Sequence, residues 1–340
     1  MRLLFVTQIV DTNDPVLGFV HHWLEIFSAR FTHIHVICLK EGAHTLPENV
    51  TVHSLGKEKG GNRFLYAIRF IKLAYGLNKE YDAVFVHMNP EYIALAGDLW
   101  RITGKRIGLW YNHQVGSIWL RLAQPFVRTV FHTSPYAYPA RYKNAKQMPA
   151  GIDTELFSPK QVARQPYRIY FQGRIAPAKR VHVLLEAVRL LRKDGISATA
   201  SLVGPEDVSY GATLRADFKD LSEAGAVTFL GTRKNEETPA LYASHTVSVN
   251  LTADGNFDKT VLESAATETP VVVASRGFKS VVPDEWMLEE NTAEGLAKKL
   301  KAVFALPEDA RTMLGTRLRT AVMEKHSLAS LADTLAQSYE

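Results

Sequence analysis

A chain of 340 residues, 46% of them apolar and 10% aromatic, can fill two domain cores, which excludes an intrinsically disordered protein. The single cysteine, Cys38, excludes an internal disulfide and favours a buried structural thiol in a reducing compartment. The net charge of +5 comes entirely from residues 1–157, which hold 17 Lys and Arg against 12 Asp and Glu, whereas residues 158–340 hold 23 of each.

Short apolar strands alternate with helical segments throughout the first half. The apolar pattern predicts strands at 3–7, 33–39, 50–55, 81–87 and 106–111, and helices at 19–30, 62–79 and 91–103. Such alternation is typical of a doubly wound parallel sheet with right-handed crossovers. We therefore expect residues 1–150 to form one Rossmann-like α/β domain.

Three loops of this half follow predicted strands, at the edge of a parallel sheet where ligands bind. Gly18 stands just before the predicted helix 19–30, where the missing side chain would let an anionic group approach the helix N-terminus. His87 and His113 stand at the ends of two other strands, and an imidazole can donate to a sugar hydroxyl or a phosphate. A purely structural role stays open for both histidines.

A polar, proline-containing segment at 149–166 interrupts the pattern, which then restarts. The second half predicts strands at 167–172, 198–203, 227–230, 246–251 and 270–274, and helices at 180–194, 211–224, 237–244, 257–267, 293–305, 308–325 and 327–338. We expect residues 151–340 to form a second α/β domain with a parallel sheet.

Two segments of the second half suit an anionic ligand. Gly173, Arg174 and Lys179 lie between a strand and a helix, where a planar guanidinium and an ammonium fit a diphosphate. Asp254 and Gly255 lie between strand 246–251 and helix 257–267, so we expect a phosphate or a sugar there. The alternative for the first segment is a pair of exposed cations at a helix start.

The second half also resembles a known family. The segments that carry the resemblance are GIDTELFSP, GRIAPAKRVHVLLEAVRLL, VTFLG, LYASHTVSVN and FDKTVLESAATETPVVVAS. In this order they resemble the donor domain of family 4 glycosyltransferases over roughly residues 150–275, and residues 293–339 resemble the closing helices of that family. The first half resembles it in architecture and in a few loop positions.

The resemblance implies the α/β GT-B fold, with two facing Rossmann-like domains and parallel sheets. Residues 1–150 would form the acceptor side, and residues 151–340 would bind a nucleotide-sugar donor and include the closing C-terminal helices. The implied reaction moves a hexose-type sugar from a nucleoside-diphosphate sugar to a hydroxyl of a glycan or lipid-linked acceptor. It retains the anomeric configuration and uses no protein nucleophile, cofactor or metal.

The resemblance also assigns roles to single residues. Arg174 and Lys179 match the pair that neutralises the donor diphosphate, next to Gly173. Glu263 matches a glutamate that accepts hydrogen bonds from ribose hydroxyls, while His113 matches an acceptor-side histidine and Gly18 a glycine loop near the phosphates. The nucleotide base would lie along Gly204 and the loop that contains Thr232.

The sequence departs from the family where the donor sugar is contacted. Gly255 stands where the family has a glutamate, eight positions before Glu263, and Phe257-Asp258 replaces the usual Phe-Gly pair. We predict that the neighbouring Asp254 takes over part of the sugar contact, helped by the backbone amides of Asn256 and Phe257. The alternative is that Asp254 caps the helix or the turn.

Other functions and partners remain open. A GT-B sugar-nucleotide epimerase would use the same nucleotide pocket, and Gly255 would suit a noncatalytic nucleotide-sugar binding protein. A metal-dependent transferase of another fold is disfavoured because the sequence has no Asp-x-Asp, and His21 and His22, adjacent on a helix, should point apart.

The basic first half, with its tryptophans, could meet an anionic membrane or an acidic acceptor, or it could be an ordinary solvated surface. We expect no nucleic-acid partner. The apolar run at the amino terminus is too short for a signal peptide and no run of eighteen apolar residues occurs, so we expect a cytoplasmic protein, in contact with the inner face of the membrane if the basic surface binds there.

Overall fold

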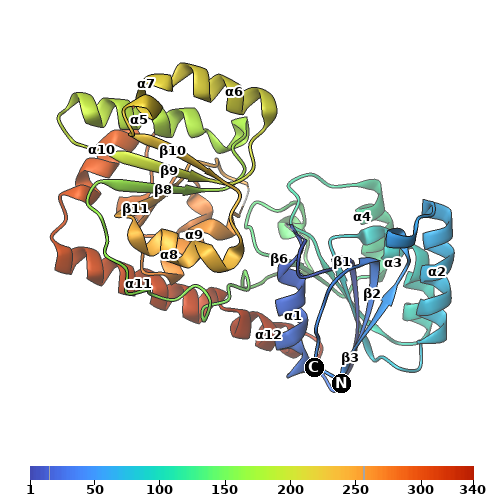
Figure 1. Ribbon diagram of the computed structural model, residues 1–340. Coiled ribbons are helices and arrows are strands. Elements are labelled where there is room, and N and C mark those ends of the chain that lie inside the picture. Colours follow the sequence, from blue (N-terminus) through green and yellow to red (C-terminus); the bar gives the residue numbers. More distant parts are fainter. Residues whose placement is uncertain (15, 256) are drawn as a thin grey trace. The chain divides into compact units, whose positions relative to one another are not determined.

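The computed structural model describes residues 1–14, 16–255 and 257–340, and its chain forms two units (Figure 1). The first unit contains Met1–Gly151 and Leu328–Glu340, and the second contains Ile152–Ser327. Every pairing between the described strands is parallel, as the alternation of strands and helices predicts.

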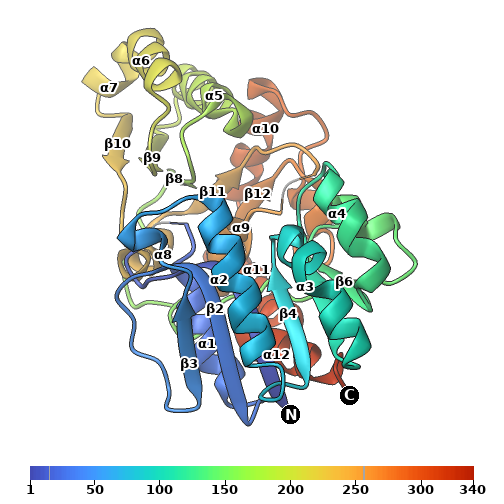
Figure 2. The same ribbon diagram turned by 90° about the vertical axis from the view of Figure 1, so that its right-hand side faces the viewer.

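The first unit has a seven-stranded sheet in the order β3-β2-β1-β4-β5-β6-β7. Its elements are β1 (Arg2–Val10), α1 (Phe19–Ser28), β2 (His33–Glu41), β3 (Val50–Ser54), α2 (Arg63–Gly76), β4 (Ala83–His87), α3 (Pro90–Ile102), β5 (Arg106–Trp110), α4 (Ile118–Ala123), β6 (Thr129–His132), β7 (Ala145–Gln147) and α12 (Leu328–Gln337). Figure 2 shows α2 and α3 over the face of this sheet that is turned toward the viewer.

The central strands of this sheet are buried on both faces, which explains why they are continuous apolar runs. Leu3 and Phe5 of β1 pack toward α1 and α12, whereas Leu4 and Val6 pack toward α2, α3 and α4. Cys38 of β2 lies in the first of these clusters, and burial raises the pKa of its thiol to about 12. The prediction of a buried structural thiol is therefore confirmed.

The C-terminal helix α12 belongs to the first unit, so the structure corrects the expected single domain 151–340 at its C-terminal end. Leu331 and Leu335 are buried in the same cluster as Trp23 of α1. The Tyr339 hydroxyl donates to the Val84 carbonyl of β4 at 2.8 Å. The apolar face of this amphipathic helix therefore completes the core of the first unit.

The second unit has a five-stranded sheet in the order β10-β9-β8-β11-β12. Its elements are β8 (Arg168–Gln172), α5 (Val181–Lys193), β9 (Thr199–Val203), α6 (Val208–Asp217), α7 (Lys219–Glu223), β10 (Val227–Gly231), α8 (Thr238–Ser244), β11 (Val247–Asn250), α9 (Lys259–Ala266), β12 (Val271–Val273), α10 (Ala293–Phe304) and α11 (Glu308–His326). Figure 1 shows α5, α6 and α7 above this sheet and α8 and α9 below it.

Two predicted helices of the second unit differ from the observed ones. The segment 211–224 is two helices, because Phe218 leaves the helical region with φ −119° and turns its buried ring into the core. The first of them starts early because the Asp207 carboxylate accepts from the Tyr210 amide at 3.0 Å. Helix α9 begins at Lys259, two residues after the predicted start.

None of the described helices combines the length and the apolarity that crossing a bilayer requires.

Candidate functional site

The carboxyl ends of β8, β9 and β10 lie at one edge of the second sheet, where Gly173 follows β8, Gly204 follows β9 and Gly231 is the last residue of β10. A Cβ on Gly204 would lie 2.0 Å from the Gly173 carbonyl oxygen, so only glycine permits this approach. The Gly204 amide donates to the Gly231 carbonyl at 3.0 Å, and Thr232 is exposed directly after it. The structure thus brings the predicted loops at Gly173, Gly204 and Thr232 to one edge.

The two predicted cations at this edge differ in their surroundings. Arg174 is exposed, and it has no hydrogen bond or ion pair with any residue that the structure describes. Lys179 lies in a one-turn 3-10 helix, Pro177–Lys179, and α5 starts only at Val181 because Arg180 has a φ of 51°. The two cations therefore precede a left-handed residue and do not open directly onto α5 as expected.

Lys179 points instead at the loop between β11 and α9. Its Nζ donates to Asp258 Oδ2 at 2.6 Å and to Thr252 Oγ1 at 3.1 Å. The same Oδ2 accepts from the Thr252 hydroxyl at 2.6 Å and from the Asn250 amide at 2.8 Å. Burial by itself raises the pKa of Asp258, but the Lys179 ammonium and these hydrogen bonds outweigh it and lower the pKa below its usual value.

Asp254 makes a different set of contacts. Its Oδ1 accepts from the Ser275 hydroxyl at 3.0 Å and from the Arg276 backbone amide at 2.6 Å. The carboxylate thus ties the β11–α9 loop to the loop after β12. These bonds resemble the capping alternative, although Asp254 caps the turn at Arg276 and not helix α9.

Glu263 lies on α9 and its carboxylate is half-buried. The Tyr242 hydroxyl donates to its Oε2 at 3.3 Å. Burial raises the pKa of Glu263 to about 7, although the Lys259 ammonium and the Tyr242 hydroxyl act in the opposite direction. Burial likewise lowers the pKa of Lys259 to about 8. Glu263 is therefore a carboxyl group that can change its charge near neutral pH.

The rest of the predicted donor loop is partly described. The Phe257 ring stacks on the buried Phe278 ring with centroids 4.5 Å apart, so its side chain anchors the loop. Gly255 is buried. The predicted amide contact of Asn256 lies outside the described residues.

The two predicted residues of the first unit lie after strands of its sheet. A Cβ on Gly18 would lie 2.8 Å from the Asp14 carbonyl oxygen, and the Gly18 amide already donates to that oxygen. Glycine is therefore required there by the turn before α1. His113 is exposed in the loop after β5, and its ring contacts the Tyr111 ring edge-on with centroids 5.3 Å apart.

His21 and His22 do not point apart as expected, since both approach Glu25. The Glu25 Oε2 lies 3.5 Å from His21 Nδ1 and 2.8 Å from His22 Nδ1, and ligand atoms of the three residues lie within 4.8 Å of one another. The Thr45 backbone amide donates to His21 Nε2 at 3.1 Å, so the ring proton sits on Nδ1. A metal at Nδ1 would have to displace that proton, so this geometry does not suit a metal ion.

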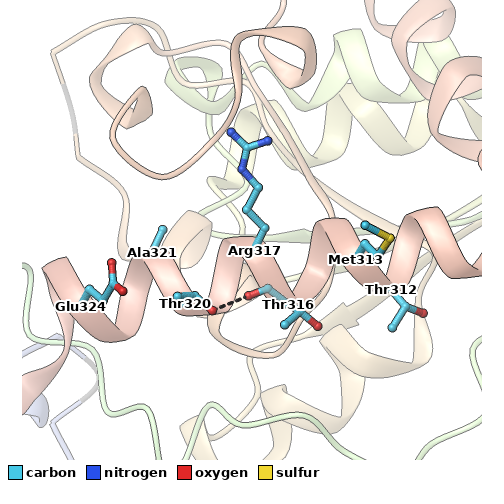
Figure 3. Close-up of a pocket in the computed structure, with 7 residues that line it drawn as sticks. All are labelled: Thr312, Met313, Thr316, Arg317, Thr320, Ala321 and Glu324. Carbon is cyan, nitrogen blue, oxygen red and sulfur yellow. Dashed lines mark hydrogen bonds between the residues drawn. The ribbon is translucent and has the colours of Figure 1, made fainter.

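A separate hollow of about 590 Å³ lies on the outer side of α11 (Figure 3). Its lining comes from that helix alone: Thr312, Met313, Thr316, Arg317, Thr320, Ala321 and Glu324. One helix face with a single cation offers no convergent polar groups, so this hollow is not the candidate site.

The two parallel sheets and the donor-side loops define the GT-B fold, and comparisons with known proteins agree. Residues 166–305 match the model of the family described as "Glycosyl transferases group 1". This match covers most of the second unit and supports a glycosyltransferase.

Sequence comparison finds the "Putative colanic acid biosynthesis glycosyltransferase WcaL" of Escherichia coli K12, which is 27% identical over 184 residues. This alignment covers 51% of the chain but only 45% of the relative, so the chain matches less than half the length of that protein.

Solved structures of the same fold match over almost the whole chain. Anabaena Alr3699/HepE in complex with UDP has a TM-score of 0.79 at 18% identity, with 99% of each chain covered. The same protein in complex with UDP-glucose has a TM-score of 0.77 at 17% identity and the same coverage. A sucrose-phosphate synthase from Thermosynechococcus elongatus has a TM-score of 0.72 at 20% identity, with 100% and 98% covered.

Sequence reasoning missed two partners of the site. The sequence shows Asp258 as a departure from the family pattern. Its pairing with Lys179 depends on how the loop folds and cannot be predicted from the spacing of the two residues. Tyr242 stands 21 residues before its partner Glu263, on another helix, and only the structure brings them together.

Proposed function

We propose that the protein is a retaining glycosyltransferase that moves a hexose-type sugar from a nucleoside-diphosphate sugar to a hydroxyl of a glycan or lipid-linked acceptor. The observation that carries this proposal is the meeting of Gly173, Arg174, Lys179 and α9 at one edge of a domain that matches glycosyl transferases group 1. The UDP and UDP-glucose complexes of the structural neighbour support a nucleotide-sugar donor.

The proposed chemistry follows from the charges at this edge. Departure of a nucleoside diphosphate places negative charge on its phosphate oxygens, and Arg174 and Lys179 would stabilise that charge without a metal ion. Glu263 would accept from the ribose hydroxyls, and the base would lie along Gly204 and Thr232. His113 and Gly18 would act from the acceptor-side unit.

A ligand screen tests the proposal. UDP, GDP, dTDP and their common sugar derivatives are added to the protein, and melting is followed. A ligand at about 100 times its Kd stabilises the folded state by about 2.7 kcal/mol, a shift of several degrees for a domain of this size. If none of these ligands shifts the melting temperature and none is turned over, the proposal is wrong.

The same screen separates the two rival functions. A sugar-nucleotide epimerase would convert the bound donor into its epimer without an acceptor, whereas a noncatalytic binding protein would be stabilised without any turnover. Slow hydrolysis of the donor with retained configuration, followed by NMR, would support a retaining transferase.

We further propose that the first unit contacts an anionic membrane through a surface at α4, which suits a lipid-linked acceptor at the inner face of a membrane. In α4, Leu120 and Ala123 are buried. The exposed apolar residues of this helix, together with Val115 just before it, form the α4 surface. The exposed fractions of its apolar residues are 75% for Val115, 62% for Ile118, 46% for Trp119 and 50% for Leu122. Single exposed apolar residues are ordinary, but four within eight positions are typical of an interaction surface.

The charge around the α4 surface has one sign. Residues 99–152 contain eight Lys and Arg and no Asp or Glu. Arg121 lies on the exposed face of α4 itself, between Trp119 and Leu122. Apolar side chains with Trp among basic residues are the composition that binds the interface of an anionic bilayer, and a soluble acidic partner would not need the apolar face.

The fluorescence emission of Trp119 can report contact with a membrane. The other four tryptophans, Trp23, Trp100, Trp110 and Trp286, are at most 8% exposed. Vesicles of phosphatidylcholine with phosphatidylglycerol should shift the emission of Trp119 to the blue and sediment the protein, and salt should weaken both effects. The double substitution Ile118→Ser and Leu122→Ser should abolish them, while Val208→Ser, at a still more exposed position of the second unit (89%), should not. Equal binding of both variants would contradict the proposal.

A further inference from the structure

The missing sugar-binding carboxylate has a candidate that the sequence did not suggest. We propose that Asp258 accepts a hydrogen bond from a hydroxyl of the donor sugar and is a specificity-determining residue of the donor site. The inference rests on the proposed function, because it needs a nucleotide sugar at the carboxyl edge of the second sheet.

The two oxygens of Asp258 are used unequally. Oδ2 accepts from Lys179, Thr252 and Asn250, at 2.6, 2.6 and 2.8 Å respectively. Oδ1 has no hydrogen bond with any described residue, and 18% of the side chain is exposed. Three donors on one oxygen fix the orientation of the carboxylate, so the other oxygen is held ready to accept from a ligand.

The position of Asp258 is also suitable. It is the N-cap residue of α9, but its side chain does not cap that helix. The carboxylate instead lies against Lys179, which is predicted to hold the diphosphate, and three residues after Gly255, where the sugar contact is missing. A carboxylate that contacts a lysine expected to bind the diphosphate lies close to where the sugar attached to that diphosphate would be.

Asp254 is less suitable for this contact. The Ser275 hydroxyl and the Arg276 amide both donate to its Oδ1, so this carboxylate holds two loops together. These bonds hold Asp254 against the loop after β12, whereas Asp258 is held against Lys179, the residue expected to bind the diphosphate.

The ion pair between Lys179 and Asp258 supports a role for this site beyond binding the diphosphate. Lys179 has three donor hydrogens and uses two of them, on Asp258 and Thr252, so one can still reach a phosphate oxygen. Its charge is nevertheless balanced by Asp258, which weakens its attraction for an anion. The carboxylate is therefore unfavourable for the diphosphate alone and favours a ligand that also offers a neutral hydroxyl.

The experiment compares ligands with and without the sugar. Calorimetry measures UDP against UDP-glucose, GDP against GDP-mannose and dTDP against dTDP-glucose, and the pair that the wild type binds is used further. In Asp258→Asn the nucleoside diphosphate should bind equally or more tightly, while the nucleotide sugar should lose about tenfold in affinity relative to it. Donor hydrolysis should fall by a similar factor.

Asp254→Asn is the matched control and should leave the ratio of the two affinities unchanged. If Asp258→Asn changes both ligands by the same factor, Asp258 acts only through Lys179 and the inference is overturned, as it is if neither affinity changes. If this variant does not fold at the assay temperature, Asp258→Glu replaces it: the charge on Lys179 is kept, the carboxylate moves by one methylene, and the sugar-dependent affinity should still fall. A wild type that binds none of the pairs would refute the proposed function itself, and with it this inference, whereas an unchanged ratio refutes the inference alone.

Discussion

The proposed contact of Glu263 with the ribose predicts a pH dependence of nucleotide binding whose size can be calculated. Its carboxyl is half-buried on α9, and burial raises its pKa to about 7. The ionised carboxylate of Glu263 can accept a hydrogen bond from each ribose hydroxyl. The protonated form carries a hydrogen on one of its oxygens and is a poorer acceptor. Binding of the donor should therefore strengthen as the pH rises through 7 and release a proton at lower pH.

The expected size follows from the ionised fraction of Glu263. With a pKa of about 7, this fraction is roughly 0.1 at pH 6 and roughly 0.9 at pH 8, so the affinity should rise by about tenfold between them. The ligand must be a nucleotide sugar, because its diphosphate is esterified at both ends and does not titrate in this range. Isothermal titration calorimetry in two buffers of different ionisation enthalpy measures both the affinity and the released proton.

Glu263→Gln is the matched variant, since it keeps the volume and an acceptor for Tyr242. It should bind the nucleotide sugar more weakly at pH 8, by about tenfold, and its affinity should be flat between pH 6 and 8. Its melting temperature at pH 8 should not fall, because a raised pKa means that the folded state disfavours the ionised carboxylate. A variant that binds normally and only melts earlier would show that Glu263 is structural, and a wild type with a flat profile would refute the ribose contact.

Further predictions concern the cations, metals and acid stability. Arg174→Ala should weaken nucleoside-diphosphate binding by about tenfold or more, and Lys179→Ala by at least as much, because it also leaves the Asp258 carboxylate unpaired beside the phosphates; unchanged affinity in both variants would contradict the phosphate site. Transfer should survive EDTA, and complete loss that magnesium or manganese restores would contradict a metal-free mechanism. Burial and the neighbouring histidines lower the pKa of His35, so the unfolded chain binds more protons and the melting temperature should fall as the pH drops below about 6.5. Melting curves at pH 5 and 7.5 check this, and His35→Gln should reduce the difference if the histidine causes it.

Much of the fold could be predicted because strand and helix signals are local. The strand at 246–251 is observed as Val247–Asn250 and the strand at 270–274 as Val271–Val273, since apolar runs between turn residues show where a buried strand lies. Boundaries were predicted less well where a single side chain decides them. Asp207 starts α6 earlier than the apolar pattern indicates, through one hydrogen bond to the Tyr210 amide.

The unit to which a helix belongs could not be predicted. The pattern of 327–338 shows one apolar face, but it does not say which core that face completes. In the structure Leu331, Leu335 and Tyr339 fill the core beside α1, far away in sequence. Tertiary packing decides which unit this helix joins, and the spacing of its apolar residues does not indicate it.

The contacts of the two carboxylates in the candidate site could not be predicted from the sequence either. Asp254 and Asp258 lie in one loop, and the sequence led us to expect the sugar contact at Asp254 alone. Only the fold shows that Asp254 contacts Ser275 and Arg276 whereas Asp258 contacts Lys179.

The pairing of Lys179 with Asp258 bears on what kind of ligand the site evolved to hold. A site for a bare diphosphate would gain most from uncompensated cations, and of the two cations assigned to the phosphates Arg174 is unpaired among the described residues whereas Lys179 is paired with Asp258. Placing a carboxylate on the second cation reduces the attraction for an anion, and that cost is offset only if the carboxylate contacts another part of the ligand. Sugar hydroxyls are such partners, because they donate to a carboxylate without adding charge. If Lys179 and Asp258 act as we propose, the charges of this edge suit a nucleotide sugar better than a free nucleotide.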